Sequence, residues 1–224
     1  GVAVNAEGHT EANMGIAYGD SDGDGKLDII ISHLVGEHHT LWRARPSRDG
    51  TMFYRDETFE AGIGIDSRKL TGWGTSLSDF DHDGLLDLIV VNGHPRREPN
   101  QTYTYENPPI LWHNIGGGRF RNVTATAGPY FQTQHQSRGL AVGDLDGDGR
   151  LDLVVVSHYS PSVALWNETP PRGSSLVVQL TCLRSNRDAI GSRVTVTVGD
   201  RTLIRTLDSG GSYISSNDPK LHFG

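Results

Sequence analysis

The sequence predicts an all-β protein, with a partial β-propeller of about three blades followed by a small C-terminal β domain. Three observations predict this fold. One acidic nine-residue loop occurs three times, and each copy joins a stretch with the two-residue alternation of a β-strand to a β-branched run typical of a buried strand. Four strand-like stretches per repeat match the content of one propeller blade. Beyond Pro170-Pro171 the repeat pattern ends and other alternating stretches begin.

The repeated loops are DSDGDGKLD at 20–28, DFDHDGLLD at 79–87 and DLDGDGRLD at 144–152. Each has Asp at its first, third, fifth and ninth places, Gly at its sixth and Leu at its eighth. Four carboxylates held so close together repel one another unless a cation neutralises them. Calcium takes six to eight oxygen ligands, so we predict one structural calcium ion in each loop, about three in all.

The predicted ligands are the carboxylates of the four aspartates and the backbone carbonyl of the seventh residue. They are Asp20, Asp22, Asp24, Lys26 and Asp28; Asp79, Asp81, Asp83, Leu85 and Asp87; and Asp144, Asp146, Asp148, Arg150 and Asp152. Glycine at the sixth place allows the positive φ that a chain turning around an ion requires. The alternative is a turn that binds nothing, but such a turn needs fewer acidic residues.

An EF-hand is excluded by the twelfth place, where that motif has a bidentate Glu. Here the place holds Ile31, Val90 and Val155. The ninth Asp also leads directly into β-branched runs, which are typical of buried strands. Each loop is therefore expected to join two strands.

The stretches before the loops are GIAYGD at 15–20, GTSLSD at 74–79 and GLAVGD at 139–144. One face of each is made of small residues, which predicts close backbone approach on the innermost strand of a blade. After the loops, Leu-Trp recurs at 41–42, 111–112 and 165–166, and we expect these Trp residues to lie in the core between blades. The Trp lies 14 residues past the ninth Asp in copies one and three and 25 in copy two, where an insertion falls between His94 and Ile110.

The loops and their preceding strands resemble FG-GAP/VCBS repeats, the calcium-bearing blades also found in integrin α-chains, over roughly residues 10–168. Residues 175–182, 193–198 and 201–207 alternate as strands, with a turn at Gly199-Asp200. Residues 186–194 and 209–224 resemble the ASPIC/UnbV domain that follows such repeats in cartilage acidic protein-like proteins. The resemblance implies a calcium-binding propeller segment joined to this second domain.

We therefore divide the chain into a propeller segment, residues 1–169, and a truncated ASPIC/UnbV-like domain, residues 172–224. Propellers typically need four to eight blades. Three blades are too few for a closed ring, so we expect this sequence to be a fragment and the rest of its own chain to complete the propeller.

The charge and composition of the chain limit the classes of partner and the cellular location that we expect. Three calcium ions would bring the formal net charge of −7 to −1, and no basic patch is evident, which argues against nucleic acid or an anionic membrane as partner. No segment is apolar for long enough to insert into a membrane, and Cys182 has no partner for a disulfide. Calcium sites of moderate affinity suit the calcium concentration outside cells, and the resemblance implies the same location: extracellular, periplasmic or cell surface.

The predicted function is a calcium-binding extracellular or cell-surface binding or adhesion module, without catalysis, that binds a protein or glycan ligand through exposed propeller loops. No hydrolase, zinc-protease, Walker or dinucleotide motif occurs. One alternative is the non-catalytic accessory part of a larger secreted enzyme. A second is a metal-dependent enzyme that uses a His-rich propeller face formed by His33, His94 and His158.

Two further expectations concern the surface. Trp73 precedes the inner strand of copy two near the inserted loop, and with Arg97, Tyr103 and Tyr105 it could offer an aromatic and cationic ligand surface. His82 occupies the fourth place of the second loop, where we expect the side chain to face solvent.

Overall fold

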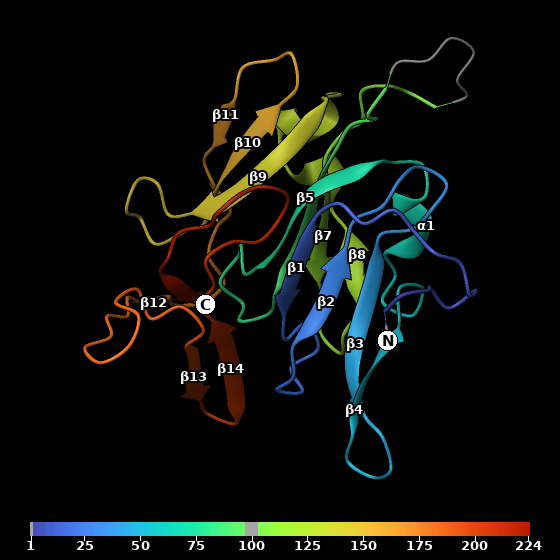
Figure 1. The fold of residues 1–224 in the computed structure, drawn as a ribbon. Helices are drawn as coiled ribbons and strands as arrows, with labels where there is room; N and C mark the ends of the chain where they lie inside the picture. The colour runs from blue at the N-terminus through green and yellow to red at the C-terminus, as the bar shows by residue number, and fades with distance from the viewer. Residues whose placement is uncertain (1, 97–102) are drawn as a thin grey trace.

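Three antiparallel sheets correspond to the three repeats in the computed structural model, which describes residues 2–96 and 103–224 (Figure 1). The first sheet contains β1 (Ile16–Gly19), β2 (Asp28–Ile31), β3 (Thr40–Pro46) and β4 (Met52–Asp56). The second contains β5 (Gly72–Ser78), β6 (Asp87–Asn92), β7 (Ile110–Asn114) and β8 (Phe120–Asn122). The third contains β9 (Ser137–Gly143), β10 (Asp152–Ser157) and β11 (Val163–Leu165). Consecutive strands are neighbours in each sheet, so each repeat forms one blade.

Helical structure is confined to short segments in the described residues. They are α1 (Gly64–Ser67) and the 3-10 turns η1 (Thr124–Thr126) and η2 (Pro129–Gln132). None of these segments has the length and apolar character needed to cross a membrane. The all-β prediction is confirmed.

The inner strands of the blades are β1, β5 and β9, and β5 packs between the other two (Figure 1). Their small residues allow this approach. A Cβ added to Gly15 would lie 1.7 Å from the Trp73 carbonyl oxygen, and one added to Gly74 would lie 2.5 Å from the Leu140 Cβ. In the described part of the chain the blades form an open array, which confirms the predicted partial propeller.

Two hydrophobic clusters fill the spaces between neighbouring blades. Leu41, Leu88 and Trp112 belong to the first, between blades one and two, and all three side chains are fully buried. Leu140 and Val155 belong to the second, between blades two and three. Strands on either side of the acidic loops and the third strands of the blades therefore contribute to these cores.

The prediction that the Leu-Trp tryptophans lie in the core between blades is confirmed for Trp112 and wrong for Trp166, while Trp42 is buried but belongs to neither inter-blade cluster. Trp42 pairs with Ile29 and Trp112 with Leu88, in each case the residue after the ninth Asp, and both Trp side chains are buried. In blade three the equivalent partner of Leu153 is Leu165, so Trp166 is displaced by one place. A one-residue shift turns a strand side chain to the opposite face, and Trp166 is 56% exposed.

The C-terminal residues form two further sheets with their own small core. β12 (Leu176–Val178) pairs with β15 (Leu221–Phe223), and β13 (Arg193–Val198) pairs with β14 (Arg201–Thr206). The strands predicted at 193–198 and 201–207 are confirmed, whereas the stretch predicted at 175–182 is a strand only in β12. A hydrophobic cluster that includes Leu203 and Phe223 packs these strands together. The domain division between residues 169 and 172 stays a prediction.

One C-terminal stretch, residues 211–218, lies against the inner strands of all three blades, and we call it the central segment. Ser212 exchanges two backbone hydrogen bonds with Ile16 of β1, and its Oγ accepts a hydrogen bond from the Thr75 amide of β5. Asn217 Oδ1 accepts a hydrogen bond from the Val142 amide of β9. The central segment thus satisfies backbone groups that the open inner strands would otherwise leave unpaired.

Replacing Trp112 by Ala is expected to lower the free energy of unfolding by about 3–5 kcal/mol, because it leaves a cavity in a fully packed core. The matched control is Trp166→Ala, which removes the same side chain from an exposed position and is expected to cost less than about 1 kcal/mol. Urea unfolding of both variants in calcium buffer measures the difference. Equal losses would contradict the register of the third blade.

Candidate metal centres

The first Asp of each acidic loop binds the backbone of its own loop; we number them loop 1 (20–28), loop 2 (79–87) and loop 3 (144–152). Asp20 accepts hydrogen bonds from the amides of Gly23 at 2.8 Å and Gly25 at 2.9 Å. Asp79 accepts one from Gly84 at 2.9 Å, and Asp144 accepts one from the sixth-place glycine of loop 3 at 3.0 Å. The sixth-place glycines have φ between 84° and 89°, as predicted. Each loop is therefore wound around its first carboxylate.

The ninth Asp of each loop connects the loop to the third strand of the same blade. One carboxylate oxygen accepts a hydrogen bond from the amide of the second loop residue, and the other accepts one from a third-strand amide. The second-residue donors are Ser21, Phe80 and Leu145, and the third-strand or adjacent donors are Ala44, Asn114 and Asn167. Asp28, Asp87 and Asp152 are at most 4% exposed, so these bonds lie in the protein interior.

The remaining carboxylates converge in a way that fits a hard cation. Oxygens of three aspartates lie within 4.8 Å of one another in each loop. These groups are Asp20, Asp22 and Asp24; Asp79, Asp81 and Asp83; and Asp144, Asp146 and Asp152. Ligands on opposite sides of one calcium ion are about 5 Å apart, so the oxygens have the spacing of a calcium shell. Asp28, Asp87 and Asp148 fall outside these groups, and calcium ligation by any of the predicted residues, including the carbonyls of Lys26, Leu85 and Arg150, stays a prediction.

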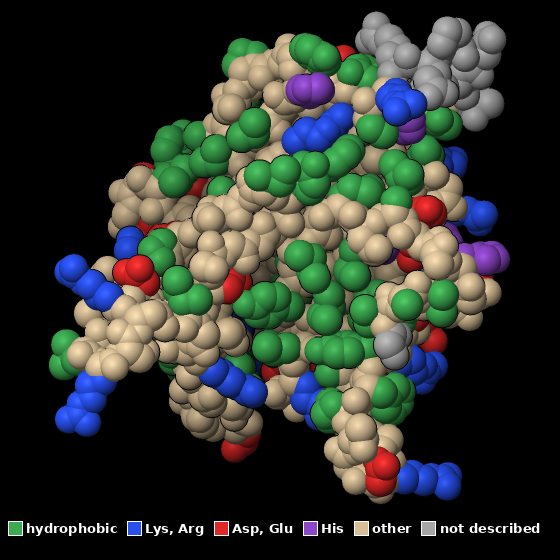
Figure 2. Space-filling view, viewed as in Figure 1, with side chains coloured by type: hydrophobic (Ala, Val, Ile, Leu, Met, Phe, Trp, Pro, Cys, Tyr) green, Lys and Arg blue, Asp and Glu red, His purple; other side chains and the backbone are tan. Residues whose placement is uncertain are grey.

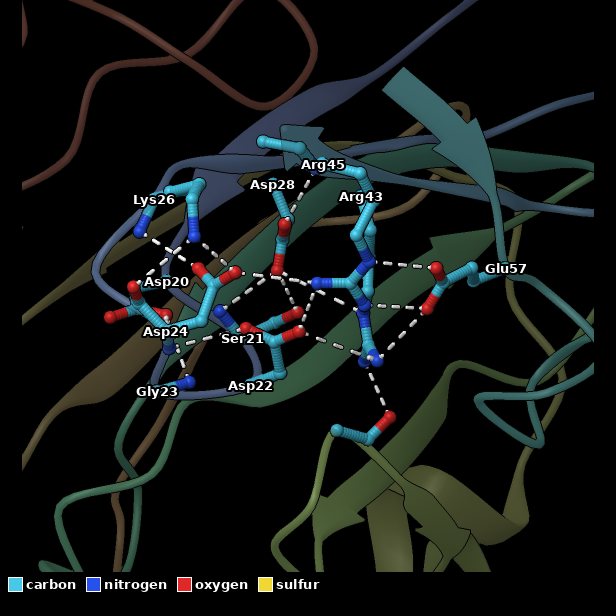
Figure 3. Close-up of polar contacts among 12 residues, drawn as sticks. Asp20, Ser21, Asp22, Gly23, Asp24, Lys26, Asp28, Arg43, Arg45 and Glu57 are labelled. Carbon is cyan, nitrogen blue, oxygen red and sulfur yellow. Dashed lines mark hydrogen bonds and ion pairs between the residues drawn. The ribbon is translucent and has the colours of Figure 1, made fainter. Parts of the chain in front are cut away.

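Cationic side chains approach the carboxylates of loop 1 from β3 (Figure 3). Arg45 lies 2.8 Å from Asp22 and 3.3 Å from Asp24, and it forms a two-point pair with Glu57. Lys26 pairs with Asp24 at 2.7 Å. These cations neutralise part of the loop charge, and calcium in loop 1 has to share Asp22 and Asp24 with them or replace them.

Loop 2 has a different set of neighbours. His113 Nδ1 of β7 lies 2.9 Å from Asp87 Oδ1, and Arg172 Nε lies 3.1 Å from Asp81 Oδ2. Arg172 also approaches Asp83 at 3.5 Å. In the part of the chain that the structure describes, loop 3 has a single ion pair, between Arg150 and Asp148. The three loops thus share a backbone frame but differ in the charge that surrounds it.

Burial makes several of these carboxylates hard to ionise without a metal. Desolvation raises the pKa of Asp28 to about 6 and that of Asp87 to about 7. It also raises the pKa values of Asp20 and Asp79. A bound divalent cation would favour the charged forms, so calcium and protons compete for these groups.

The C-terminal sheets contact the loops through arginines. Arg193 donates to the Gly25 carbonyl at 2.6 Å, and Arg201 donates to the Asp83 carbonyl at 2.9 Å. Burial lowers the pKa of Arg205, while the carboxylates of Asp79 and Asp20 oppose that shift. Figure 2 shows Lys and Arg side chains around the lower edge of the molecule, where Figure 1 places β13, β14 and the β3–β4 hairpin.

The predicted His-rich face is not assembled as one metal site among the described residues. His33 Nδ1 lies 2.6 Å from the Ala12 carbonyl, and His94 Nδ1 lies 2.8 Å from the Arg96 carbonyl. His158 packs on the ring of Tyr159. None of the described groups of three or more metal-capable side chains contains these histidines.

Trp73 and Tyr103, two residues of the predicted aromatic ligand surface, contact other residues of the same chain. Trp73 donates to the Gly93 carbonyl and is flanked by Arg138 at 4.2 Å and Tyr213 at 4.8 Å. Tyr103 packs on the ring of His94, and Arg97 lies outside the described residues. Trp73 therefore supports the central segment through Tyr213.

The expectation that His82 faces solvent is wrong, because the residue is 7% exposed. The C-terminal part of the chain covers it: a Cβ added to Gly224 would lie 2.4 Å from the His82 Cα, and one added to Gly173 would lie 2.5 Å from the His82 carbonyl oxygen. Sequence reasoning also missed His113, which lies in β7, far from the loop motif in the sequence. The only available signal was its place directly after the Leu-Trp step.

The raised pKa of Asp87 predicts a specific pH dependence without metal. Asp87 titrates near pH 7 when folded and near 3.8 when unfolded, so between these values the folded protein holds an extra proton. Stability from this group is therefore present at low pH and lost as the pH rises through about 7. Metal-free wild type should gain stability relative to Asp87→Asn as the pH falls from 8 to 5.

Urea unfolding in chelator at several pH values measures this difference, and groups common to both proteins cancel. In saturating calcium the trend should reverse, because protons then displace the metal. A stability difference between the two proteins that is independent of pH would contradict the assignment of Asp87.

Comparison with known proteins agrees with the fold and the repeat. The FG-GAP-like repeat profile matches residues 79–155, and the ASPIC and UnbV profile matches residues 182–224. The first match spans loops 2 and 3, and loop 1 has the same backbone geometry outside it.

Relatives with the name cartilage acidic protein 1 are similar to this chain. The Mus musculus protein is 28% identical over 157 residues, which cover 67% of this chain and 22% of that protein. The Xenopus tropicalis protein is 24% identical over 214 residues, which cover 94% of this chain and 31% of that protein. The chain thus spans about a fifth to a third of these relatives, and within it the match to the FG-GAP-like repeat precedes the match to the ASPIC and UnbV profile.

Proposed function

We propose that this chain is a calcium-stabilised binding module, without catalysis, of an extracellular or cell-surface protein. The observation that carries the proposal is the shared architecture of the three loops. In each, the first Asp binds the loop backbone, the ninth Asp binds the third strand, and further carboxylate oxygens cluster within 4.8 Å. Calcium at these places would hold each inner strand to the next strand of its blade.

The energetic reason is that each loop concentrates four carboxylates, and in loops 1 and 2 burial already disfavours the charged forms of Asp20, Asp28, Asp79 and Asp87. A ligand that binds only the folded state stabilises it by about 4 kcal/mol per site when its concentration is 1,000 times its dissociation constant. With three sites, calcium would supply a large part of a typical domain stability. The name of the relatives, cartilage acidic protein 1, supports an extracellular location.

The partner surface is proposed at the end of the blades opposite the calcium loops. Tyr159, directly after β10, and Ile214, in the central segment, are both 86% exposed there. Connections between strands at such an end tolerate variation and commonly carry recognition. An exposed tyrosine and an exposed nonpolar side chain are both suited to contact a protein or glycan partner.

Removal of calcium is expected to lower the melting temperature strongly. Differential scanning calorimetry in calcium and in excess EGTA measures the change, and calcium, but not magnesium, should restore it. An unchanged melting temperature would contradict the proposal.

Isothermal titration calorimetry tests the number of sites. Asp20→Asn, Asp79→Asn and Asp144→Asn are each expected to remove one tightly bound calcium ion, because each change removes the charge at the centre of one loop. Asp200→Asn, the same change in the exposed β13–β14 turn, is the control and should retain all ions. Loss of no ion in any loop variant would reject the ligand assignment.

Tyr159→Ser should weaken binding to an extracellular partner at least tenfold without changing the melting temperature. Arrays of glycans and of purified matrix proteins, probed in calcium with wild type and variant, supply the measurement. Equal binding of wild type and Tyr159→Ser to every partner found would contradict a recognition surface at Tyr159.

A further inference from the structure

The three blades differ at one structurally equivalent place beside the ninth Asp. The residue just before the third-strand amide donor is Arg43 in blade one, His113 in blade two and Trp166 in blade three. Only His113 offers a metal-binding atom at this place. Loop 2 therefore has a potential nitrogen ligand at a position where blades one and three have none.

His113 and two loop carboxylates form a compact group. His113 Nδ1 lies 2.9 Å from Asp87 Oδ1 and 3.6 Å from Asp81 Oδ2. Asp81, Asp87 and His113 are 6%, 4% and 9% exposed, and ligand atoms of all three lie within 4.8 Å of one another. The group sits between the start of β6 and the middle of β7, which are paired strands, so its spacing is held by the sheet.

Asp81 gives an independent indication of a ligand. Its Oδ1 is buried and has no hydrogen-bond partner, although the residue is only 6% exposed. A buried carboxylate oxygen without a partner carries a substantial desolvation cost. A metal ion bound between Asp81, Asp87 and His113 would remove that cost.

The chemistry of the group favours a transition metal over calcium. Calcium selects oxygen ligands, whereas zinc binds imidazole nitrogen and carboxylate oxygen together. Ligands about 2.1 Å from one zinc ion lie about 3.0–3.5 Å apart in octahedral to tetrahedral geometry. The separations of 2.9 and 3.6 Å from His113 Nδ1 each lie within about 0.1 Å of that range, one just below it and one just above it.

We propose that Asp81, Asp87 and His113 form a zinc-class metal site in loop 2, which exchanges with calcium in this loop alone. The proposal goes beyond the calcium function of the module and does not depend on calcium binding in loops 1 and 3. It makes the second blade responsive to a transition metal while the other two blades respond to calcium.

Arg172 acts as the competitor for this site. Its NH1 lies 3.0 Å from His113 Nε2, and because a guanidinium has only donors, Nε2 accepts and Nδ1 carries the proton donated to Asp87. Metal binding removes the proton from Nδ1, and a proton is taken up at Nε2, so the imidazole stays neutral. The Arg172 side chain is 55% exposed and is free to move into solvent when Nε2 becomes a donor.

The test uses the full chain saturated with calcium, and titrates it with Zn²⁺ by calorimetry and with Co²⁺ by visible absorption. Wild type should bind one transition-metal ion, and bound Co²⁺ should show the absorption of a site with nitrogen and oxygen ligands. His113→Asn should weaken zinc binding at least about tenfold. Arg172→Ala should strengthen it severalfold, because the competitor is gone.

His158→Asn, which changes an exposed histidine away from loop 2, is the matched control and should bind zinc as wild type does. Thermal unfolding in calcium verifies that each variant is folded. If His113→Asn does not fold, the Arg172→Ala variant still tests the proposal. Absence of zinc binding by wild type, or equal binding by His113→Asn, would overturn the proposal. Calcium titration of metal-free samples of the same proteins separates this failure from a failure of loops 1 and 3 to bind calcium.

Discussion

The structure depends on the crowding of carboxylates at three turns. The first Asp of each loop organises the loop backbone, and the ninth connects the loop to the third strand. In loops 1 and 2 burial makes the charges of these groups unfavourable without a counter-ion, and it raises the pKa values of Asp20, Asp28, Asp79 and Asp87. The same aspartates that define the blade therefore make it dependent on cations, supplied by arginines, by a metal or by both.

The C-terminal part of the chain binds to the inner strands and to the loops that these aspartates organise. The central segment pairs with the inner strands of all three blades, and Arg193 and Arg201 bind loop carbonyls. Those carbonyls have a fixed direction only while the loops keep their conformation. Four carboxylates exceed the charge of one divalent ion, so a loop that holds calcium remains anionic and still attracts these arginines. Metal in the loops and docking of the C-terminal sheets are thus compatible.

Much of this arrangement could be predicted from the sequence, because it depends on residue patterns within short segments. The loops, the small inner strands and the β13–β14 hairpin follow from spacing and alternation within short segments. The failures have a common physical origin in contacts between distant segments. Trp166 is exposed because the turn after β10 shifts the register by one residue, and His82 is buried because C-terminal residues cover it. His113 reaches loop 2 only through the pairing of β6 with β7, which no local motif reveals.

The most direct test of the central claim is an anomalous diffraction map from crystals of this chain grown in calcium. We predict a peak in each of the three loops, about 2.3–2.6 Å from oxygens of the first, third, fifth and ninth aspartates and from the carbonyl oxygen of the seventh residue. Arg45 would then give up or share its contacts with Asp22 and Asp24. Loops without peaks, with Arg45 and Arg172 still paired to the carboxylates, would contradict it and assign the neutralising role to the arginines.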